Sequence, residues 1–402
     1  RWGAAQPPIE ITGDLHDPNR IAFRSNSAVF WLGESLWERT VRGNGCTACP
    51  IRCHTIIKVP GVAAKYGIGE TAQNTCVGLV FGARFFRELP GGRQGPAALE
   101  ASMLGMHLAD DLGVWCNYGQ LQRDLIKLYY GGLLKAKLGS AEYASIPWRK
   151  YEAGDPEFLL DFLPRVGLRR GELGQVLGQG AAGLFDQWSI PEEDWAGDHA
   201  TSYWKMGHPK HHANEDDGQC GVIINTQYNR DACCHSHTNF IRNGLPLEVQ
   251  KRLAAEIWGS PDAVDGIGAY TPMNEYKARR ARWSLVRKEL HDSLGLCNWM
   301  GPWVASPLQS RGYRGDDSLE SRLYSLATGR EIDREGLDRI GERIFTVHRA
   351  LTLRDMGQLD LRGQHDRMPP WIFEDPAGAP PFSPGAIRMD RADMSLALDL
   401  FY

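Results

Sequence analysis

The sequence predicts a mainly α-helical protein, and three observations support this. Apolar residues recur at helical spacing in several long segments, glycine or proline interrupts the chain where these segments end, and strand-like runs are few and short. The chain has 402 residues, which suffices for two or three domains of ordinary size. Its 42% apolar and 23% charged residues are typical of a globular protein and exclude a coiled-coil rod or a collagen-like fibre.

The predicted elements follow from this spacing in chain order. Residues 1–25 are rich in Pro, Gly and Asp and predict a linker or an extended arm, before two helical domains over residues 26–209 and 210–402. One short strand is predicted at residues 221–224. The predicted helices are residues 99–110 before Gly113, 121–128 before Gly131, 249–257 before Gly259, 276–294, and 337–351.

Charge and cysteine content narrow the class of protein. Lys+Arg 45 against Asp+Glu 49 gives a net charge of −4, which indicates neither a nucleic-acid partner nor an anionic lipid surface. No apolar run reaches the roughly 18 residues of a membrane span. An odd count of 9 Cys favours reduced thiols and a metal site in the cytoplasm over a disulfide scaffold. The chain starts without Met or an apolar leader, so we expect no signal peptide and regard it as the later part of a longer polypeptide.

The strongest chemical signal is Cys46-Thr-Ala-Cys49-Pro-Ile-Arg-Cys53, a C-x2-C-x3-C motif. Three thiolates this close in sequence can hold one face of an iron–sulfur cluster, and Cys297 is the candidate for a fourth ligand. A structural zinc site that adds His54 to the three cysteines is an alternative, as are buried free thiols. A cluster with one open iron normally has the two spacings in the reverse order.

Together with Asp292-Ser-Leu-Gly-Leu-Cys297, these cysteines resemble the motifs of the tungsten-containing aldehyde:ferredoxin oxidoreductase family, in a less characterised bacterial branch. The resemblance extends over nearly the whole chain and implies two helical domains of that family's type, with its N-terminal β domain absent from this sequence. It also implies a [4Fe–4S] cluster beside a bis-pterin cofactor of tungsten or molybdenum. The implied cluster ligands are Cys46, Cys49, Cys53 and Cys297, and the implied contacts of one pterin are Asp292 and Leu296.

A second motif of the family, D-x-x-G-L-D, contacts the other pterin. Here it reads Asp110-Asp-Leu-Gly-Val-Trp-Cys116, so the resemblance implies contacts from Asp110 and Val114. Trp115 replaces the final Asp of the motif. Stacking of Trp115 on the pterin, or a contact from Cys116 or Asp111 in place of the missing Asp, are the alternatives.

Aldehyde oxidation with water needs a general base and a hydrogen-bond donor to the carbonyl oxygen. Glu70 stands where the family has its catalytic carboxylate, although an exposed loop residue is the alternative. In the patch 229–239, His235 matches the active-site His best and His237 is second; a zinc site or a polar helix start are the alternatives. Cys76 is either a buried thiol or a thiolate near the metal, as in relatives that reduce aromatic thioesters.

The resemblance implies an anaerobic enzyme that oxidises an aldehyde to a carboxylic acid, or performs the reverse reaction. Electrons would pass through the cluster to ferredoxin or an iron–sulfur electron-transfer subunit. One alternative keeps the cofactors but reduces an aryl-coenzyme A thioester or an unsaturated ring, and another is a non-catalytic, metal-stabilised module. A homo-oligomer or a place in a larger complex is expected, and the sequence does not choose between tungsten and molybdenum.

Overall fold

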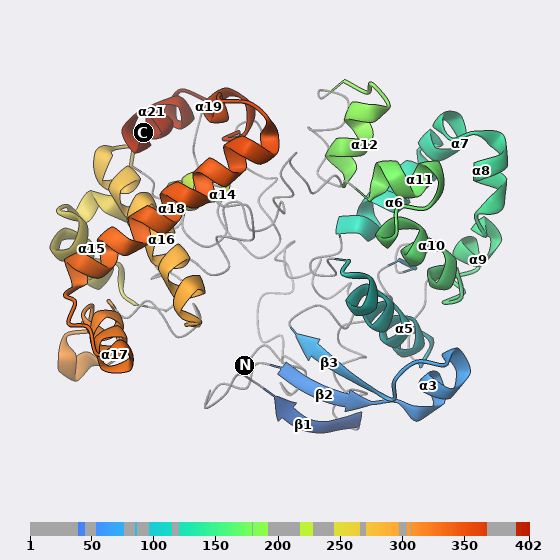
Figure 1. Cartoon of the computed structure of the whole chain (residues 1–402), viewed down its shortest axis with the longest axis horizontal. Helices are drawn as coiled ribbons and strands as arrows, with labels where there is room; N and C mark the ends of the chain where they lie inside the picture. Colours follow the sequence, from blue (N-terminus) through green and yellow to red (C-terminus); the bar gives the residue numbers. More distant parts are fainter. Residues whose placement is uncertain are drawn as a thin grey trace. The chain divides into compact units, whose positions relative to one another are not determined.

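The structure is a computed structural model, and the chain divides into two compact units, Arg1–Tyr203 and Trp204–Tyr402 (Figure 1). The prediction of a mainly α-helical protein is confirmed. None of the helices within the described ranges is long and apolar enough to cross a membrane. The described residues are 39–44, 54–75, 85–86, 96–114, 120–178, 180–191, 218–227, 245–265, 271–296, 304–306, 308–367 and 391–402.

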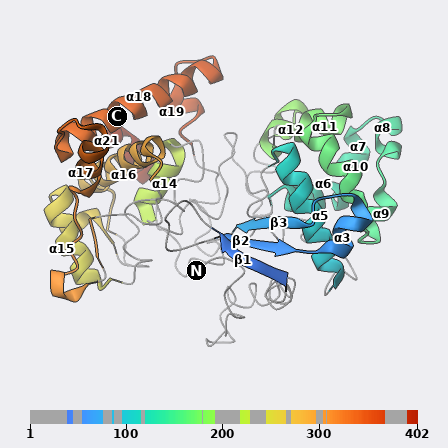
Figure 2. The same ribbon diagram turned by 60° about the horizontal axis from the view of Figure 1, so that its bottom comes forward.

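A small antiparallel sheet opens the described part of unit 1, and the sequence did not predict it. Its strands are β1 (Thr40–Asn44), β2 (His54–Lys58) and β3 (Thr71–Thr75), in the order β1-β2-β3 (Figures 1 and 2). Helix α3 (Pro60–Tyr66) joins β2 to β3 at one end of the sheet. At the other end of the sheet, the last residue pairs are Asn44↔His54 and His54↔Thr75.

The rest of unit 1 is helical. Helix α5 packs against α3, β3 and α10, and its residues Leu99 and Met103 are buried. An aromatic cluster fills the space beside α10, where the rings of Phe158 and Phe162 stack with centroids 5.1 Å apart. The helices are α5 (Pro96–Leu112), α6 (Gln120–Tyr130), α7 (Leu133–Lys137), α8 (Ser140–Ser145), α9 (Trp148–Glu152), α10 (Phe158–Gly167), α11 (Gly171–Leu177) and α12 (Ala181–Gln187).

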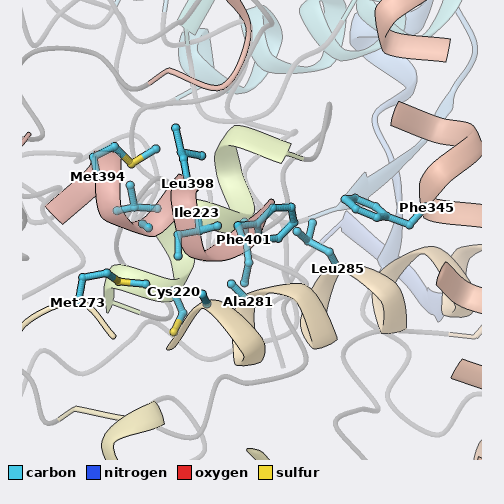
Figure 3. Packing of buried hydrophobic residues seen from close by; sticks show 13 residues of the cluster. Cys220, Ile223, Met273, Ala281, Leu285, Phe345, Met394, Leu398 and Phe401 are labelled. Atoms are coloured by element: carbon cyan, nitrogen blue, oxygen red, sulfur yellow. The ribbon is translucent and has the colours of Figure 1, made fainter. Parts of the chain in front are cut away.

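Unit 2 is built around one long helix, α16, which packs against α14, α15, α18 and α21. Its core includes Ile223 of α14, Leu285 of α16 and Phe401 of α21, which lie together in Figure 3. The elements are α14 (Gly218–Gln227), α15 (Leu247–Trp258), η4 (Pro261–Ala263), α16 (Glu275–Leu294), η5 (Gln309–Arg311), α17 (Leu319–Thr328), α18 (Arg334–Met356), α19 (Leu361–Gln364) and α21 (Arg391–Phe401).

The predicted strand at residues 221–224 is wrong, because this segment lies inside helix α14. A run of four apolar residues fits a buried strand and a helix surrounded on several sides equally well. Val222, Ile223 and Ile224 are all at most 2% exposed, since α14 packs against both α16 and α21.

Helix α18 forms as predicted, but its apolar stripe is only partly buried. Leu337 is fully buried, whereas Val347 is 59% exposed and Leu351 is 41% exposed. The buried face instead runs through Gly341, where a Cβ atom would lie 2.8 Å from Cγ1 of Val286. Glycine at this position therefore lets α18 approach α16 closely, which rotates part of the predicted stripe outward.

Candidate functional site

The predicted site residues fall into two groups, those outside the described residues and those within them. The predicted residues that lie outside the described residues are Cys46, Cys49, Cys53, Cys76, Trp115, Cys116, His235, His237 and Cys297. The described candidates are Glu70, Asp110, Val114, Asp292 and Leu296. Within the described part of the chain, no group of three or more His, Cys, Asp or Glu side chains is arranged to hold a metal ion.

The sheet register relates the cysteine-bearing segments to one another. Because Asn44 pairs with His54, the connection 45–53 leaves and re-enters the sheet at the same end. His54 also pairs with Thr75, so the chain that continues to Cys76 leaves from this end as well. The three segment boundaries next to the predicted cysteines, Asn44, His54 and Thr75, are thus neighbours in space, although the sequence separates them by up to 31 positions.

Glu70 lies at the opposite end of the sheet's third strand, just before β3. Its carbonyl oxygen accepts a hydrogen bond of 2.9 Å from the backbone N–H of Val59. Its Oε2 lies 2.8 Å from Nζ of Lys58, and the Glu70 side chain is 56% exposed in the chain by itself. The first contact holds the backbone of Glu70 and the second holds its carboxylate, which remains open to solvent.

The first predicted pterin motif forms the end of helix α5 (Figure 1). Gly113 adopts a left-handed conformation with φ 66°. The N–H of Gly113 bonds to the Asp110 carbonyl at 3.2 Å, and the N–H of Val114 bonds to the Ala109 carbonyl at 2.8 Å. These two bonds define a Schellman motif, which explains the glycine in D-x-x-G, because a residue with a Cβ is strained at this φ.

The second predicted pterin motif ends helix α16 in the same way. Gly295 has φ 68°, its N–H bonds to the Asp292 carbonyl at 3.4 Å, and the N–H of Leu296 bonds to the His291 carbonyl at 2.9 Å. Asp110 and Asp292 therefore occupy equivalent positions in two helices of different units. The sequence showed the shared letters, and the structure adds that both motifs have one backbone geometry.

An aspartate near a helix C-terminus is locally unfavourable, because the helix dipole places partial negative charge there. Helix α5 has no basic residue in its last turn to offset Asp110. Asp292 is offset by Lys288, whose Nζ lies 2.7 Å from Oδ1, yet the Asp292 side chain stays 38% exposed. Two carboxylates held at unfavourable helix ends indicate a role other than helix stability.

Buried ionic groups hold the end of α16 that carries Asp292. Nε2 of His291 lies 3.0 Å from Oε1 of Glu320, and Nη1 of Arg287 lies 3.4 Å from the same oxygen. Nη2 of Arg287 lies 2.8 Å from Oδ1 of Asp338, and burial raises the pKa of this carboxyl even though Arg287 acts to lower it. This cluster of His291, Arg287, Glu320 and Asp338 is named the α16 ionic cluster.

A second buried network fixes the chain where the His-rich patch begins. Nη1 of Arg349 donates to the carbonyl of Gln227, the last residue of α14, at 3.3 Å. Nη2 of Arg349 bonds both oxygens of Asp366 at 2.8 and 2.9 Å, and the hydroxyl of Tyr402 also donates to Asp366. A cation at the C-terminal carbonyl of α14 complements the helix dipole and holds this end of the helix.

Burial acts to raise the pKa of Asp366, but hydrogen bonds from His365, Tyr402 and Arg349 and the charge of Arg349 hold this pKa below its usual range. The Asp366→Asn variant is expected to lose about 3 kcal/mol at pH 7, because Arg349 would keep its charge without a carboxylate partner. A carboxyl with a lowered pKa stabilises the fold above its unfolded-state pKa, and this contribution is lost as the pH falls.

The difference between wild type and Asp366→Asn in urea unfolding should therefore be constant from pH 7 to about pH 5 and shrink below that. Asp399→Asn is the matched control, because Asp399 pairs with Arg362 at the surface with side chains 56% and 42% exposed. The control is expected to change stability far less. Equal losses from both variants would contradict this assignment.

Sequence reasoning missed His107 of α5. Its Nε2 atom is buried and has no hydrogen-bond partner. A Cβ atom on Gly69 would lie 3.3 Å from Cε1 of His107, so the imidazole packs directly on the loop that carries Glu70. The sequence did contain one indication of His107, because it precedes Asp110 by three residues and therefore by about one helical turn.

Comparison with known proteins identifies the family to which the chain belongs. One solved structure that matches is the active site complex BamBC of benzoyl coenzyme A reductase in complex with 1,5-dienoyl-CoA. The match has a TM-score of 0.53 and 15% sequence identity, and it covers 100% of this chain and 54% of that chain. The present chain thus spans about half the length of the structure it matches, and the likeness is one of fold.

A family model described as aldehyde ferredoxin oxidoreductase, domains 2 and 3, matches residues 20–402. This range includes both Schellman-capped motifs and all four predicted cluster cysteines. The matched model describes the second and third domains of the family. The chain therefore belongs to the aldehyde ferredoxin oxidoreductase family.

Proposed function

We propose that the chain is the cofactor-binding part of a bis-pterin oxidoreductase that contains tungsten or molybdenum and oxidises an aldehyde to a carboxylic acid, or performs the reverse reaction. One observation carries this proposal: Asp110 and Asp292 occupy equivalent positions in two Schellman-capped helix ends, at the two motifs that contact the pterins in this family. The proposed cluster ligands are Cys46, Cys49, Cys53 and Cys297.

The described residues fit such a cofactor in two respects. Asp110 and Asp292 present exposed carboxylates that would accept hydrogen bonds from a bound heterocycle with several N–H groups. His107 offers a buried nitrogen that lacks a partner among the described residues. Val114 and Leu296 follow the two glycines, and Trp115 and Cys116 complete the proposed contacts of the first motif.

The reaction is RCHO + H2O → RCOOH + 2 e⁻ + 2 H⁺. When bound, the metal–pterin group would accept the two electrons and pass them through the iron–sulfur cluster to ferredoxin or an iron–sulfur subunit. Glu70 is proposed to take a proton from water or from the hydrated aldehyde. His235, with His237 as the second candidate, is proposed to donate a hydrogen bond to the substrate oxygen.

A second candidate function keeps the same cofactors and reduces an unsaturated ring in an aryl-coenzyme A thioester. The structural match to the benzoyl coenzyme A reductase complex favours it, although that likeness is one of fold. In this case Cys76 would lie on or near the metal. A Cys76→Ser variant would then lose ring reduction, whereas in an aldehyde oxidoreductase it would keep most of its activity.

The test starts with the protein produced anaerobically with tungstate and molybdate. Elemental analysis is expected to give about four Fe and one W or Mo per chain, with pterin detected after acid oxidation. Dye reduction with a panel of aldehydes, compared with aryl-coenzyme A compounds, separates the two candidate reactions. Zinc without iron would contradict the proposal and support a non-catalytic module.

Cys49→Ser provides the variant for this test. We expect it to lose most of the iron and all dye reduction, because a cluster that only carries electrons needs four protein ligands. Cys220→Ser is the matched control, since Cys220 is a buried thiol whose Sγ lies 3.4 Å from the Lys277 carbonyl in the core of unit 2. The control should keep its iron, and iron loss in both variants would indicate general unfolding.

A further inference from the structure

Within the part of the chain that the structure describes, the buried Nε2 atom of His107 has no hydrogen-bond partner. Most buried polar side-chain atoms in folded proteins have a partner, because a buried group that loses its bond to water without replacement destabilises the fold. An apolar residue at this position would pack beside Met103 and Leu104, which are fully buried one turn earlier in α5. A ligand with a hydrogen-bonding group at this nitrogen would complete the hydrogen bonding of the imidazole.

The ring is held against the loop that carries Glu70. A Cβ atom on Gly69 would lie 3.3 Å from Cε1 of His107 and 3.8 Å from the Thr71 carbonyl. Gly69 is not among the glycines with positive φ, so its backbone does not require glycine. The absence of a side chain at Gly69 instead makes room for the imidazole, and this contact links helix α5 to the loop just before Glu70.

Helical spacing links the same ring to Asp110. Residues three apart in an α-helix lie on one face, so His107 and Asp110 face the same side of α5, one turn apart. His107 thus contacts the Glu70 loop and lies one turn before the Schellman-capped end of α5. The sequence connected these two segments only through the family resemblance.

We propose that Nε2 of His107 forms a hydrogen bond with the polar edge of the pterin that the Asp110 motif binds. This inference rests on the proposed function. A pterin ring carries N–H donors as well as ring-nitrogen and carbonyl acceptors, so it satisfies either tautomer of the imidazole. His107 is a positioning residue in this arrangement, because it fixes the pterin relative to Glu70.

The test compares three variants of the full chain. His107→Phe keeps the ring volume and removes the hydrogen bond, and His107→Gln keeps a polar atom near the same place. Ser102→Ala is the matched control, because Ser102 is a fully buried residue of the same helix whose Oγ also has no partner. Ser102 lies five positions before His107 and therefore on a different face of α5.

Two measurements separate a cofactor contact from a structural role. The first is W or Mo and pterin per chain after gel filtration of protein produced with both metals. The second is the thermal midpoint of the cofactor-free chain, produced without tungstate or molybdate. For His107→Phe we expect cofactor retention to fall roughly tenfold, as for one lost hydrogen bond, while the cofactor-free midpoint stays equal or rises.

His107→Gln should retain more cofactor than His107→Phe, and Ser102→Ala should raise the midpoint without changing retention. Wild-type retention by His107→Phe would overturn the inference and leave the proposed function intact, including the case in which only turnover falls. A cofactor-free midpoint lowered by His107→Phe would also overturn it, because the imidazole would then be structural. Wild-type protein without W, Mo and pterin would instead overturn the proposed function itself.

Discussion

The Glu320→Ala variant is expected to lose about 3–5 kcal/mol of unfolding free energy, because it leaves Arg287 buried without one of its two carboxylate partners. The Arg287 side chain is 2% exposed and the Glu320 side chain 5% exposed, so neither group has water to replace the other. Nε2 of His291 also loses its 3.0 Å contact with Oε1 of Glu320. Urea unfolding followed by circular dichroism measures the loss.

Glu342→Ala is the matched control for this prediction. Glu342 of α18 and Arg282 of α16 form an ion pair at 3.6 Å, but their side chains are 48% and 49% exposed. Water screens such a pair, so the control is expected to cost less than about 1 kcal/mol. Similar losses from Glu320→Ala and Glu342→Ala would show that the α16 ionic cluster does not stabilise unit 2 through its buried charges.

A combined variant tests the physical reason. Removing Arg287 together with both of its carboxylate partners, in Arg287→Met with Glu320→Leu and Asp338→Leu, is expected to recover much of the stability lost by Glu320→Ala, because an apolar group of similar volume needs no compensating charge. The metal and pterin content of the combined variant then tests separately whether the α16 ionic cluster positions Asp292. If the α16 ionic cluster positions Asp292, cofactor retention should stay low even after stability has been recovered.

Several helices could be predicted because their signals are local. In α5, α15 and α16 the apolar spacing and a glycine in the left-handed conformation just after the last turn both lie within one short segment. The strands gave no such signal. Thr40–Asn44 and Thr71–Thr75 are mostly polar and contain residues that disfavour strands, so only their pairing with the more apolar β2 makes them strands.

The burial of charged residues in unit 2 could not be predicted from the sequence, for a different reason. The segment Glu275–Leu294 is so rich in Lys, Arg and Glu that its pattern is typical of a solvated helix. Lys277, Arg287 and His291 are nevertheless buried. Their partners Asp265, Glu320 and Asp338 lie on other elements, and no local pattern indicates which distant carboxylates will be close.

In the candidate site, too, the local motifs could be predicted from the sequence, whereas the contacts between distant residues could not. The letters D-x-x-G predicted the two motifs, and their glycines already indicated turns that a side chain would strain. The matching hydrogen bonds at Val114 and Leu296, and the packing of His107 on Gly69, depend on the folded backbone. Sequence could therefore name candidates for cofactor contacts, whereas their geometry and the role of His107 needed the structure.

Glu70→Gln is expected to lower turnover with the preferred substrate by about 10²–10⁴-fold, the usual contribution of a positioned general base. The substitution keeps the size and a hydrogen-bond acceptor but cannot take up a proton. W or Mo, Fe and pterin per chain should stay at the wild-type level, because Glu70 is not among the proposed cofactor ligands. Full turnover with intact cofactors would exclude Glu70 as the base.

Lys58→Met is the companion variant, because Nζ of Lys58 lies 2.8 Å from Oε2 of Glu70 and both side chains are about half exposed. An exposed pair of this kind contributes little free energy, so Lys58→Met should change turnover by less than about tenfold. A Lys58→Met variant as inactive as Glu70→Gln would mean that the pair, and not the carboxylate alone, performs the proton transfer.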